Sequence, residues 1–436
     1  MLVSPTHIYP GPVGVDIKCS MSLLQLELPA DAVADVRLRR ALIEAIGQRV
    51  PTGAGHGQRS VRKARHVNAA VGAMVATEGA SPAVCAALGI PEDWPCRCED
   101  AAHTGHDGTA EALRTRLDKL RAHQFSSFAD KIAQLGSYGG GNHFGECEIV
   151  EVGTSDRAKK VADVFGLKNQ RVAFLSHCGS RGFGFQLAHH QFRALQEHFR
   201  TWSIPLPGDD KELVYAPLGT PEADAYLDDM ALGGNFATVN HLLINALVLE
   251  AFQEVIPGTK GHLVYFISHN IARQEIVGVA PDASGNWKPS TGHSHLAWVH
   301  RKGATRAFPA GHPGLAGTPF EQTGHPILLP GNPQAGSVVM VAEPGAAKSC
   351  YSVNHGAGRA KGRKAAIREF DQKAIDKSFA DCDILTNCRQ YPKDEAPAAY
   401  KDFTEVLRSV TAAGLASEVA RLRARFVIKD ADKADD

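Results

Sequence analysis

The sequence lacks several features that assign other proteins to a class. Its 47 basic and 47 acidic residues give a formal net charge of zero, so overall charge indicates no nucleic-acid partner, and any such site depends on local arrangement. No apolar run has the length needed to cross a bilayer, and residues 1–15 show no basic segment followed by an apolar one, as a signal peptide would. We therefore expect a cytoplasmic protein with no membrane partner.

Cysteine pairing and the common nucleotide motifs are also missing. The nine cysteines are odd in number and irregularly spaced, which argues against a disulfide framework, and Cys96 and Cys98 are too close together for a usual zinc knuckle. The chain has no G-x-x-x-x-G-K-[ST] phosphate loop and no convincing G-x-G-x-x-G after a strand. A nucleotide, if one binds, is therefore held by another route.

What is present is the composition of a large packed globule. Of the 436 residues, 44% are hydrophobic and 22% are charged, and the 42 glycines favour tight turns and sites lined by backbone. The length would suit two or three domains, but no internal repeat and no clear linker divides it. We predict one large domain with surface insertions and a frayed tail that begins near Lys429.

Apolar periodicity predicts the main elements. Short buried strands are expected at 23–28, 148–152, 171–176 and 263–268, the last two ending at His177 and His269. Helical spacing is found at 33–48, 109–125, 235–256, 361–379 and 403–424. Side chains at strand ends converge on sites that a rigid sheet can hold, so these histidines become candidates.

The stretch Ser352 to Arg359 carries the most chemistry for its length. His355 is followed by Gly356, Ala357 and Gly358, a turn that lets a phosphate approach the backbone amides beside an imidazole, and Arg359 adds a planar cationic fork for phosphate oxygens. Imidazole is also able to form a covalent intermediate. The alternative is a glycine-rich turn with one buried histidine.

Four further groups supply candidate metal ligands. Asp16 and Cys19 stand before a strand, a triple glycine leads to Asn142 and His143, and His177 and His269 follow strands. This mixed set of oxygen, sulfur and nitrogen ligands exceeds what one tetrahedral zinc needs, and it suits two neighbouring transition ions, such as manganese, with a bridging thiolate. For each histidine alone, a satisfied core residue is the competing interpretation.

The run from His300 to Phe308 is dense in positive charge. Arg301, Lys302 and Arg306 place three cations within six residues, so this run is the best single candidate for gripping an RNA phosphate. An ordinary solvated turn would give the same pattern.

Taken together, these motifs resemble those of the RtcB-type RNA ligase family. The matching segments run in family order from residue 11 to Lys429 and comprise Val15 to Cys19, Gly140 to Glu146, His177 to Gly182, His269-Asn270, His300 to Phe308, Pro330-Gly331, His355 to Arg359 and Ala399 to Asp402. The resemblance implies an α+β fold in a single RtcB-like catalytic domain over residues 1–436, with mixed sheets flanked by helices and a tail at 430–436.

The resemblance also implies roles for individual residues. Cys19 would bridge two Mn²⁺ ions, one also held by His177 and His269 and the other by Asp16 and His143. His355 would act as the nucleophile, assisted by Arg181 and Arg359. The GTP site would be formed by Asn142, His143, Phe144, Gly145, Glu146, His269, Asn270, Pro330, Gly331, Asn332, Pro333, Ser337, His355, Gly356, Ala357, Gly358 and Lys429. Glu146 and Lys429 are the expected readers of guanine, by acceptance and donation respectively.

The implied reaction is the GTP-dependent joining of RNA ends. His355 would attack the α-phosphate of GTP, carry GMP and pass it to an RNA 3′-phosphate, after opening of a 2′,3′-cyclic phosphate where one is present. A 5′-hydroxyl end would then displace GMP, in tRNA splicing or RNA repair. The resemblance leaves room for an accessory activating protein. Two alternatives stay open at this point: a metal-dependent phosphodiesterase acting on cyclic-phosphate RNA ends, and a non-catalytic RNA-binding relative.

The chain also departs from the family pattern. Lys18 and Ser20 stand where the family usually has glycine, and we expect them to crowd the Cys19 thiolate. Asn332, Pro333 and Gln334 replace the usual Ser-Met-Gly after Gly331. A family N-terminal segment is expected to be absent.

Overall fold

A computed structural model describes residues 1–123, 125, 127–281, 287–289 and 295–430. Within these residues the largest sheet has eight strands, which lie in the order β13 (Pro326–Asn332), β14 (Gly336–Ala342), β17 (Ala416–Lys429), β4 (Phe144–Val152), β5 (Arg171–Cys178), β3 (Ser20–Pro29) and β7 (Gly261–Ser268), with β16 (Leu385–Thr386) beside β17. Neighbours along this order are antiparallel, and only β16 is parallel to its partner.

Alternation along the central strands gives the sheet two buried faces. Leu24 and Phe174 belong to one apolar core, whereas Leu23 and Leu175, their neighbours in sequence, belong to the other. Successive side chains of a strand point to opposite faces, so a run of apolar residues is explained when both faces are covered. Side chains just beyond the ends of these strands continue to point to alternate faces of the sheet.

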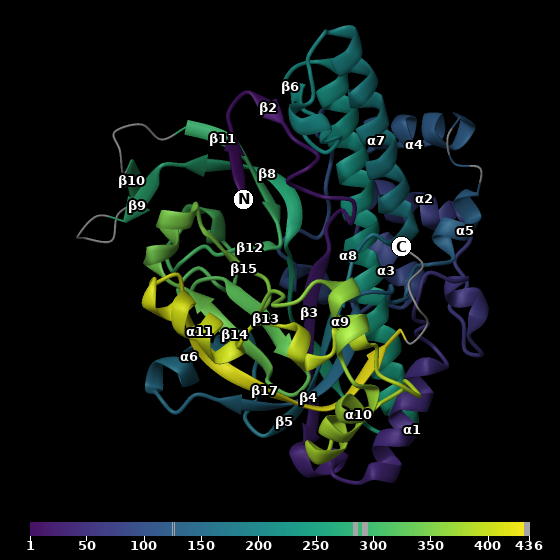
Figure 1. Ribbon diagram of the computed structural model, residues 1–436, viewed down its shortest axis with the longest axis vertical. Coiled ribbons are helices and arrows are strands. Elements are labelled where there is room, and N and C mark those ends of the chain that lie inside the picture. Colours follow the sequence, from purple (N-terminus) through teal and green to yellow (C-terminus); the bar gives the residue numbers. More distant parts are fainter. Residues whose placement is uncertain (124, 126, 282–286, 290–294, 431–436) are drawn as a thin grey trace.

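Helices cover the first face (Figure 1). The long helix α8 (Pro221–Val255) lies against β3, β5 and β7, and around it pack α1 (Val36–Gly47), α2 (Ala69–Glu78), α3 (Pro82–Leu88), α4 (Ala110–His123), α5 (Phe128–Ile132) and α7 (Arg181–Thr201). Thr220 caps α8 by accepting from the amide of Ala223, and Pro221 occupies its first turn, where its missing N–H is not needed.

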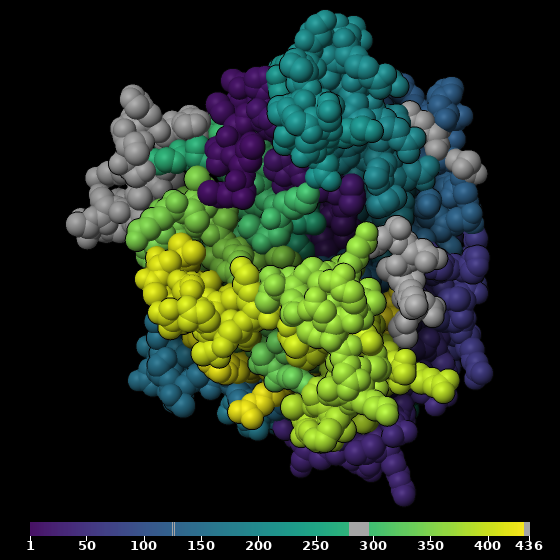
Figure 2. Space-filling view, in the orientation of Figure 1, coloured from purple at the N-terminus to yellow at the C-terminus, as the bar shows by residue number. Residues whose placement is uncertain are grey.

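The second face is covered by α6 (Asp156–Phe165), α11 (Phe403–Ala412) and the sheet of β12 (Ala304–Arg306) and β15 (Ser352–Asn354). The other small sheets comprise β1 (Leu2–Ser4), β11 (His295–Lys302) and β8 (Asn270–Val277); β9 (Val279–Pro281) with β10 (Trp287–Pro289); and β2 (His7–Ile8) with β6 (Ala216–Pro217). The β2–β6 sheet packs in the first core, which contains Ile8 and Ala216. Helices α9 (Arg363–Glu369) and α10 (Gln372–Asp381) close the edge near β16 and β17. In Figure 2, segments from the start, middle and end of the chain meet on one face.

The predicted fold class is confirmed, since one α+β assembly has sheets flanked by helices, and most predicted elements are found. The prediction for 403–424 is wrong in its second half: the helix ends at Ala412, Gly414 adopts a left-handed φ of 68°, and the chain returns as β17. The segment 361–379 divides into α9 and α10. Lys429 ends β17 and is buried, so the frayed tail does not begin there; residues 431–436 lie outside the described part.

Contrary to the expectation from sequence, one helix in the described part, α8, is long and apolar enough to cross a membrane. In the fold, 94% of its most apolar window is buried. Packing against the sheet and the neighbouring helices therefore accounts for its apolar character.

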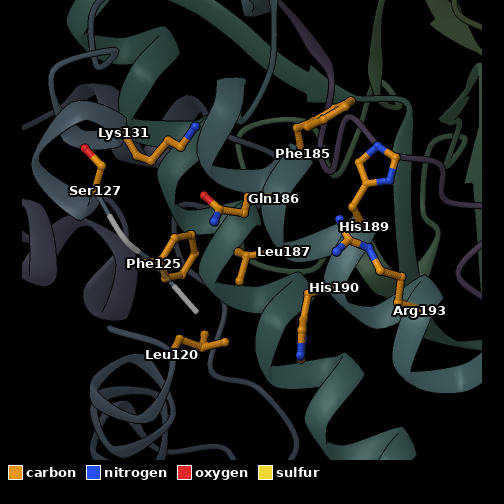
Figure 3. A pocket seen from close by; sticks show the side chains of 10 residues that line it. All are labelled: Leu120, Phe125, Ser127, Lys131, Phe185, Gln186, Leu187, His189, His190 and Arg193. Atoms are coloured by element: carbon orange, nitrogen blue, oxygen red, sulfur yellow. The ribbon is translucent and has the colours of Figure 1, made fainter. Parts of the chain in front are cut away.

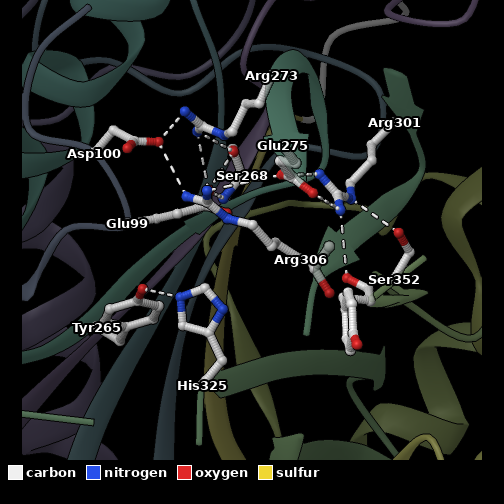
Figure 4. Close-up of polar contacts among 12 residues, drawn as sticks. Glu99, Asp100, Tyr265, Ser268, Arg273, Glu275, Arg301, Arg306, His325 and Ser352 are labelled. Carbon is white, nitrogen blue, oxygen red and sulfur yellow. Dashed lines mark hydrogen bonds and ion pairs between the residues drawn. The ribbon is translucent and has the colours of Figure 1, made fainter. Parts of the chain in front are cut away.

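The basic run from His300 to Phe308 is part of a buried charge cluster, so the prediction that it grips RNA is wrong. Arg301 donates two hydrogen bonds to Glu275, at 2.7 and 2.8 Å, and Arg306 pairs with Glu99 and Asp100 (Figure 4). Of the three cations only Lys302 is exposed, and it pairs with Glu212. A guanidinium whose N–H groups already face buried carboxylates is not available for phosphates.

This cluster anchors the strand that leads to His355. Arg301 also donates to the hydroxyl of Ser352 at 2.9 Å, and Ser352 begins β15. Burial alone would raise the pKa of Glu275, but the paired guanidinium of Arg301 holds it below its usual value. The ionised pair therefore stabilises the fold at neutral pH, and the contribution is lost as pH falls below the usual range of a carboxyl.

We expect Glu275→Gln to lower the free energy of unfolding by about 3–5 kcal/mol, because it leaves the buried guanidinium of Arg301 without its counter-charge. The matched control is Glu212→Gln, which removes an exposed ion pair and should cost less than about 1 kcal/mol. Urea unfolding at pH 7 measures both. Equal midpoints for the two variants would contradict the assigned role of the cluster.

Candidate active site

Three adjacent strands bring Cys19, His177 and His269 to one place. Cys19 immediately precedes β3, and His269 immediately follows β7; the amide of His269 donates to the carbonyl of Cys19 at 2.9 Å. On the other side of β3, His177 of β5 lies opposite Met21. Cys19 and Met21 are two residues apart and share a face, so the pleat points the thiol and both imidazoles the same way.

Asp16 and His143 approach the same point from loops. His143 Nε2 lies 3.0 Å from Asp16 Oδ2 and 3.5 Å from Cys19 Sγ. His177 Nε2 lies 3.2 Å from Cys19 Sγ and 3.3 Å from His269 Nε2. The structure therefore brings all five sequence-predicted metal ligands together. The donor atoms of Cys19, His143 and His177 form one close group, which Asp16 joins through His143, and those of His177, His269 and His355 form a second.

The donor set fits divalent metal ions. Atoms that share an ion at bond lengths of about 2.0–2.3 Å lie roughly 3.0–3.8 Å apart, depending on the coordination angle, which matches the four distances above. Burial lowers the pKa of His177 and of His269 well below the usual value, so both rings are neutral, the form that binds metals. Burial also raises the pKa of Cys19, and only a bound cation would favour its thiolate.

His355 stands over this cluster. Its ring is tilted by 33° against that of His269, with ring centroids 4.1 Å apart, and its centroid lies 6.1 Å from that of His177. Its Nδ1 donates to the carbonyl of Gly303 at 2.9 Å, and burial lowers its pKa. A neutral imidazole that donates from Nδ1 carries its lone pair on Nε2, the atom left for nucleophilic attack.

Asn270 fixes the turn that orients His355. Its Oδ1 accepts from the amide of Gly303 at 2.9 Å, and its Nδ2 donates to the carbonyl of Asp16 at 3.3 Å. Gly303 has a φ of 70°, and a Cβ there would lie 3.4 Å from the His355 ring. One amide side chain thus ties the loop of a metal-ligand candidate to the turn that holds the nucleophile candidate.

A small pocket lies beside this centre, where β4 begins and β17 ends. Its lining consists of Phe144, Glu146, Pro330, Gly331, Asn332, Pro333, Tyr391, Glu395, Tyr400, Val427 and Lys429. Burial raises the pKa of Glu146 to about 8, although Lys429 opposes the shift, and its Oε1 has no hydrogen-bond partner among the described residues. A flat ring with N–H donors would satisfy that oxygen.

The sequence of this chain is similar to those of known proteins over nearly its whole length. A family model described as tRNA-splicing ligase RtcB matches residues 2–430. The chain belongs to the RtcB family. Proteins named tRNA-splicing ligase RtcB from Thermococcus kodakarensis and Pyrobaculum aerophilum are each 32% identical to it over 430 residues, which cover 97% of this chain and 82% of each relative. One from Pyrococcus abyssi is 33% identical over 419 residues, 94% of this chain and 42% of that relative.

Membership of the RtcB family makes the protein an RNA ligase enzyme, which confirms the recognition and the activity class that the motifs implied. The two alternatives from sequence, a phosphodiesterase and a non-catalytic relative, have no such support. The cluster of histidines and cysteine is consistent with metal dependence in the family.

Within the RtcB fold, the two predicted arginines are held by other contacts. Arg181 donates to the hydroxyl of Ser137 and the carbonyl of Gly53, beside the Asp16 side of the cluster. Arg359 pairs with Glu395 at 3.1 Å and lies over the ring of Tyr400. Arg181 is therefore next to the candidate metal ligands, whereas Arg359 supports the wall of the small pocket through Glu395 and Tyr400.

The remaining predicted nucleotide residues are distributed over three places. The carbonyl of Asn142 accepts from His177 Nδ1 at 3.1 Å, so it orients a ligand. Gly145 faces the helical side of β4, where a Cβ would lie 2.8 Å from Phe174, and buried Ser337 lies on β14 outside the pocket lining. Gly356, Ala357 and Gly358 line a separate open groove with His355.

The expectation that Lys18 and Ser20 crowd the thiolate is wrong. The Ser20 hydroxyl donates to the carbonyl of Lys18. The Lys18 ammonium donates to the hydroxyl of Thr238 at 2.6 Å and to the backbone carbonyl of Asp100 at 2.9 Å. Alternation explains this, because residues on either side of Cys19 point to the opposite face. Lys18 does adopt a φ of 53°, a conformation that glycine reaches without strain.

Four pocket residues were missed by the sequence analysis, namely Tyr391, Glu395, Tyr400 and Val427. Only Tyr400 lay inside a matched segment. Glu395 is buried, pairs with Lys429 at 3.3 Å and accepts from the Tyr400 hydroxyl. Nothing in its local sequence marks it, since its importance comes from a strand distant in sequence.

A substitution at Gly179 tests the metal cluster without replacing any of the candidate ligand residues. A Cβ at position 179 would lie 2.7 Å from Asp16 Oδ2, so we expect Gly179→Ala to displace that carboxylate and weaken divalent-metal binding by about 10- to 100-fold. Manganese titration followed by elemental analysis measures this. The control is Gly47→Ala, where no atom lies within 4 Å of the new methyl group. Equal metal content in both variants would contradict the site.

Proposed function

We propose that this RNA ligase is GTP- and manganese-dependent and joins RNA 3′-phosphate or 2′,3′-cyclic phosphate ends to 5′-hydroxyl ends, in tRNA splicing or RNA repair in the cytoplasm. The observation that carries the proposal is the orientation of His355. Its Nδ1 donates to the carbonyl of Gly303, and its ring lies against that of His269, a metal-ligand candidate, with centroids 4.1 Å apart. A nucleophilic nitrogen beside a metal-ligand cluster suits attack on a phosphate.

Each chemical step exchanges one bond at phosphorus. His355 Nε2 would bond to the α-phosphorus of GTP as the bond to the β-phosphate oxygen breaks and pyrophosphate leaves. An RNA 3′-phosphate oxygen would then take GMP from His355, and a 5′-hydroxyl oxygen would finally displace GMP. Two manganese ions held by Asp16, Cys19, His143, His177 and His269 would supply positive charge at these phosphates.

The pocket at Glu146 supports a nucleotide-dependent ligase over a phosphodiesterase. Hydrolysis of a cyclic phosphate requires no site for a base, whereas the buried side chains of Glu146 and Lys429 line a pocket beside the cluster that would hold one. An ionised Glu146 would accept the ring and exocyclic N–H groups of guanine. Asn332 accepts from two amides of its own turn, which shapes the hairpin at the pocket wall in place of the usual family residues.

Incubation with radiolabelled GTP and manganese tests the nucleophile. We expect the chain to acquire acid-labile GMP, and His355→Ala to abolish the label, because no other ring presents Nε2 in this position. His66→Ala, which alters an exposed histidine, should label as the unchanged protein does. Label that survives His355→Ala would contradict the proposal.

Guanosine binding should release a proton near neutral pH. The pKa of Glu146 is raised to about 8, so the carboxyl is protonated in the empty pocket at pH 7 and must ionise to accept guanine N–H groups. Affinity should therefore rise as pH increases toward 8 and level off above it. Calorimetry in two buffers of different ionisation enthalpy measures the released proton. Glu146→Gln should remove the effect, and a pH-independent affinity in the unchanged protein would refute this role.

A further inference from the structure

A stripe of side chains runs along α7 away from the candidate active site. Arg181, Phe185, His189 and Arg193 are spaced four residues apart and so lie on one side of the helix, over a length of about 18 Å. The helix begins four residues after His177, and Arg181 lies beside the Asp16 carboxylate. The stripe therefore starts at the metal-ligand cluster and leads outward.

The outer part of the stripe borders a pocket of about 490 Å³ between α4, α5 and α7 (Figure 3). Phe185 is 51% exposed, which is unusual for a phenylalanine, and its ring contacts that of His189 with centroids 4.2 Å apart. The exposed ring of Phe185, in T-shaped contact with the imidazole of His189, can serve as a stacking platform.

Two cationic side chains line the pocket beside this platform. Lys131 and Arg193 line the pocket, and neither forms an ion pair within the described part of the chain. By contrast, Arg301 and Arg306 are held by buried carboxylates. In a chain of zero net charge, unpaired cations beside an exposed ring indicate an anionic aromatic partner.

We propose that this surface binds a single-stranded segment of the substrate RNA and guides its end to the cluster, an inference that rests on the proposed function. A base would stack on Phe185, while Lys131 and Arg193 would contact flanking phosphates. Sequence-tolerant stacking and phosphate contacts suit a ligase, because the joined ends differ between substrates. Charge complementarity favours RNA over an apolar protein segment.

The test measures RNA affinity and self-guanylylation in the same full-length variants. Phe185→Ala should weaken binding of a single-stranded RNA with a 3′-phosphate about tenfold, and Phe185→Tyr should restore it. Combined Lys131→Gln and Arg193→Gln should lower the slope of log affinity against log salt by about 0.7 for each lost contact. The control is Lys160→Gln, an exposed lysine on α6, at a distance from the pocket (Figure 1).

Self-guanylylation separates this inference from the proposed function. All of these variants should accept GMP from GTP as the unchanged protein does, because none alters the cluster or His355. Normal guanylylation with unchanged RNA affinity in Phe185→Ala would overturn the RNA surface. Absence of guanylylation in the unchanged protein, with RNA binding still dependent on Phe185, would instead overturn the proposed function and leave the surface standing. Photo-crosslinking of 4-thiouridine RNA should label residues 181–193.

Discussion

The structure depends on a cluster of electron-pair donors that face one another in a buried space. The thiol of Cys19 lies 3.2–3.5 Å from two imidazole nitrogens, and a carboxylate and a third imidazole lie just beyond. Burial opposes protonation of His177 and His269, so both rings are neutral and carry lone pairs that a cation could accept. This is the donor set that a divalent cation would require, and we regard its close packing as the constraint that shapes the centre of the fold.

In the fold, strands hold three of the candidate ligands, and a turn fixed by polar contacts holds His355. Strands β3, β5 and β7 are held on one side by α8 and on the other by a second apolar core, so their ends have little freedom. The His355 turn is fixed by polar contacts, through Asn270, Gly303 and the buried pair Arg301–Glu275. The candidate metal ligands and the candidate nucleophile thus have separate structural supports.

Much of this arrangement could be predicted from the sequence, and the failures have physical causes. His177 and His269 were found because strand ends converge, and His355 because glycines and an arginine surround it. The basic run at 300–308 was misjudged because burial and carboxylate partners, supplied by residues 99, 100 and 275, leave no mark in local sequence. Glu395 was missed for the same reason. The segment 403–424 was misjudged because apolar spacing in a helix and in a bulged strand look alike until Gly414 divides them.

The most direct measurement is a crystal structure of the protein with manganese and GTP, with anomalous scattering recorded at the manganese edge. The account requires two anomalous peaks that share the sulfur of Cys19, and continuous density from His355 Nε2 to the α-phosphorus of GMP, with the base beside Glu146. A single peak, peaks remote from Cys19, or a nucleotide bound away from His355 would contradict it.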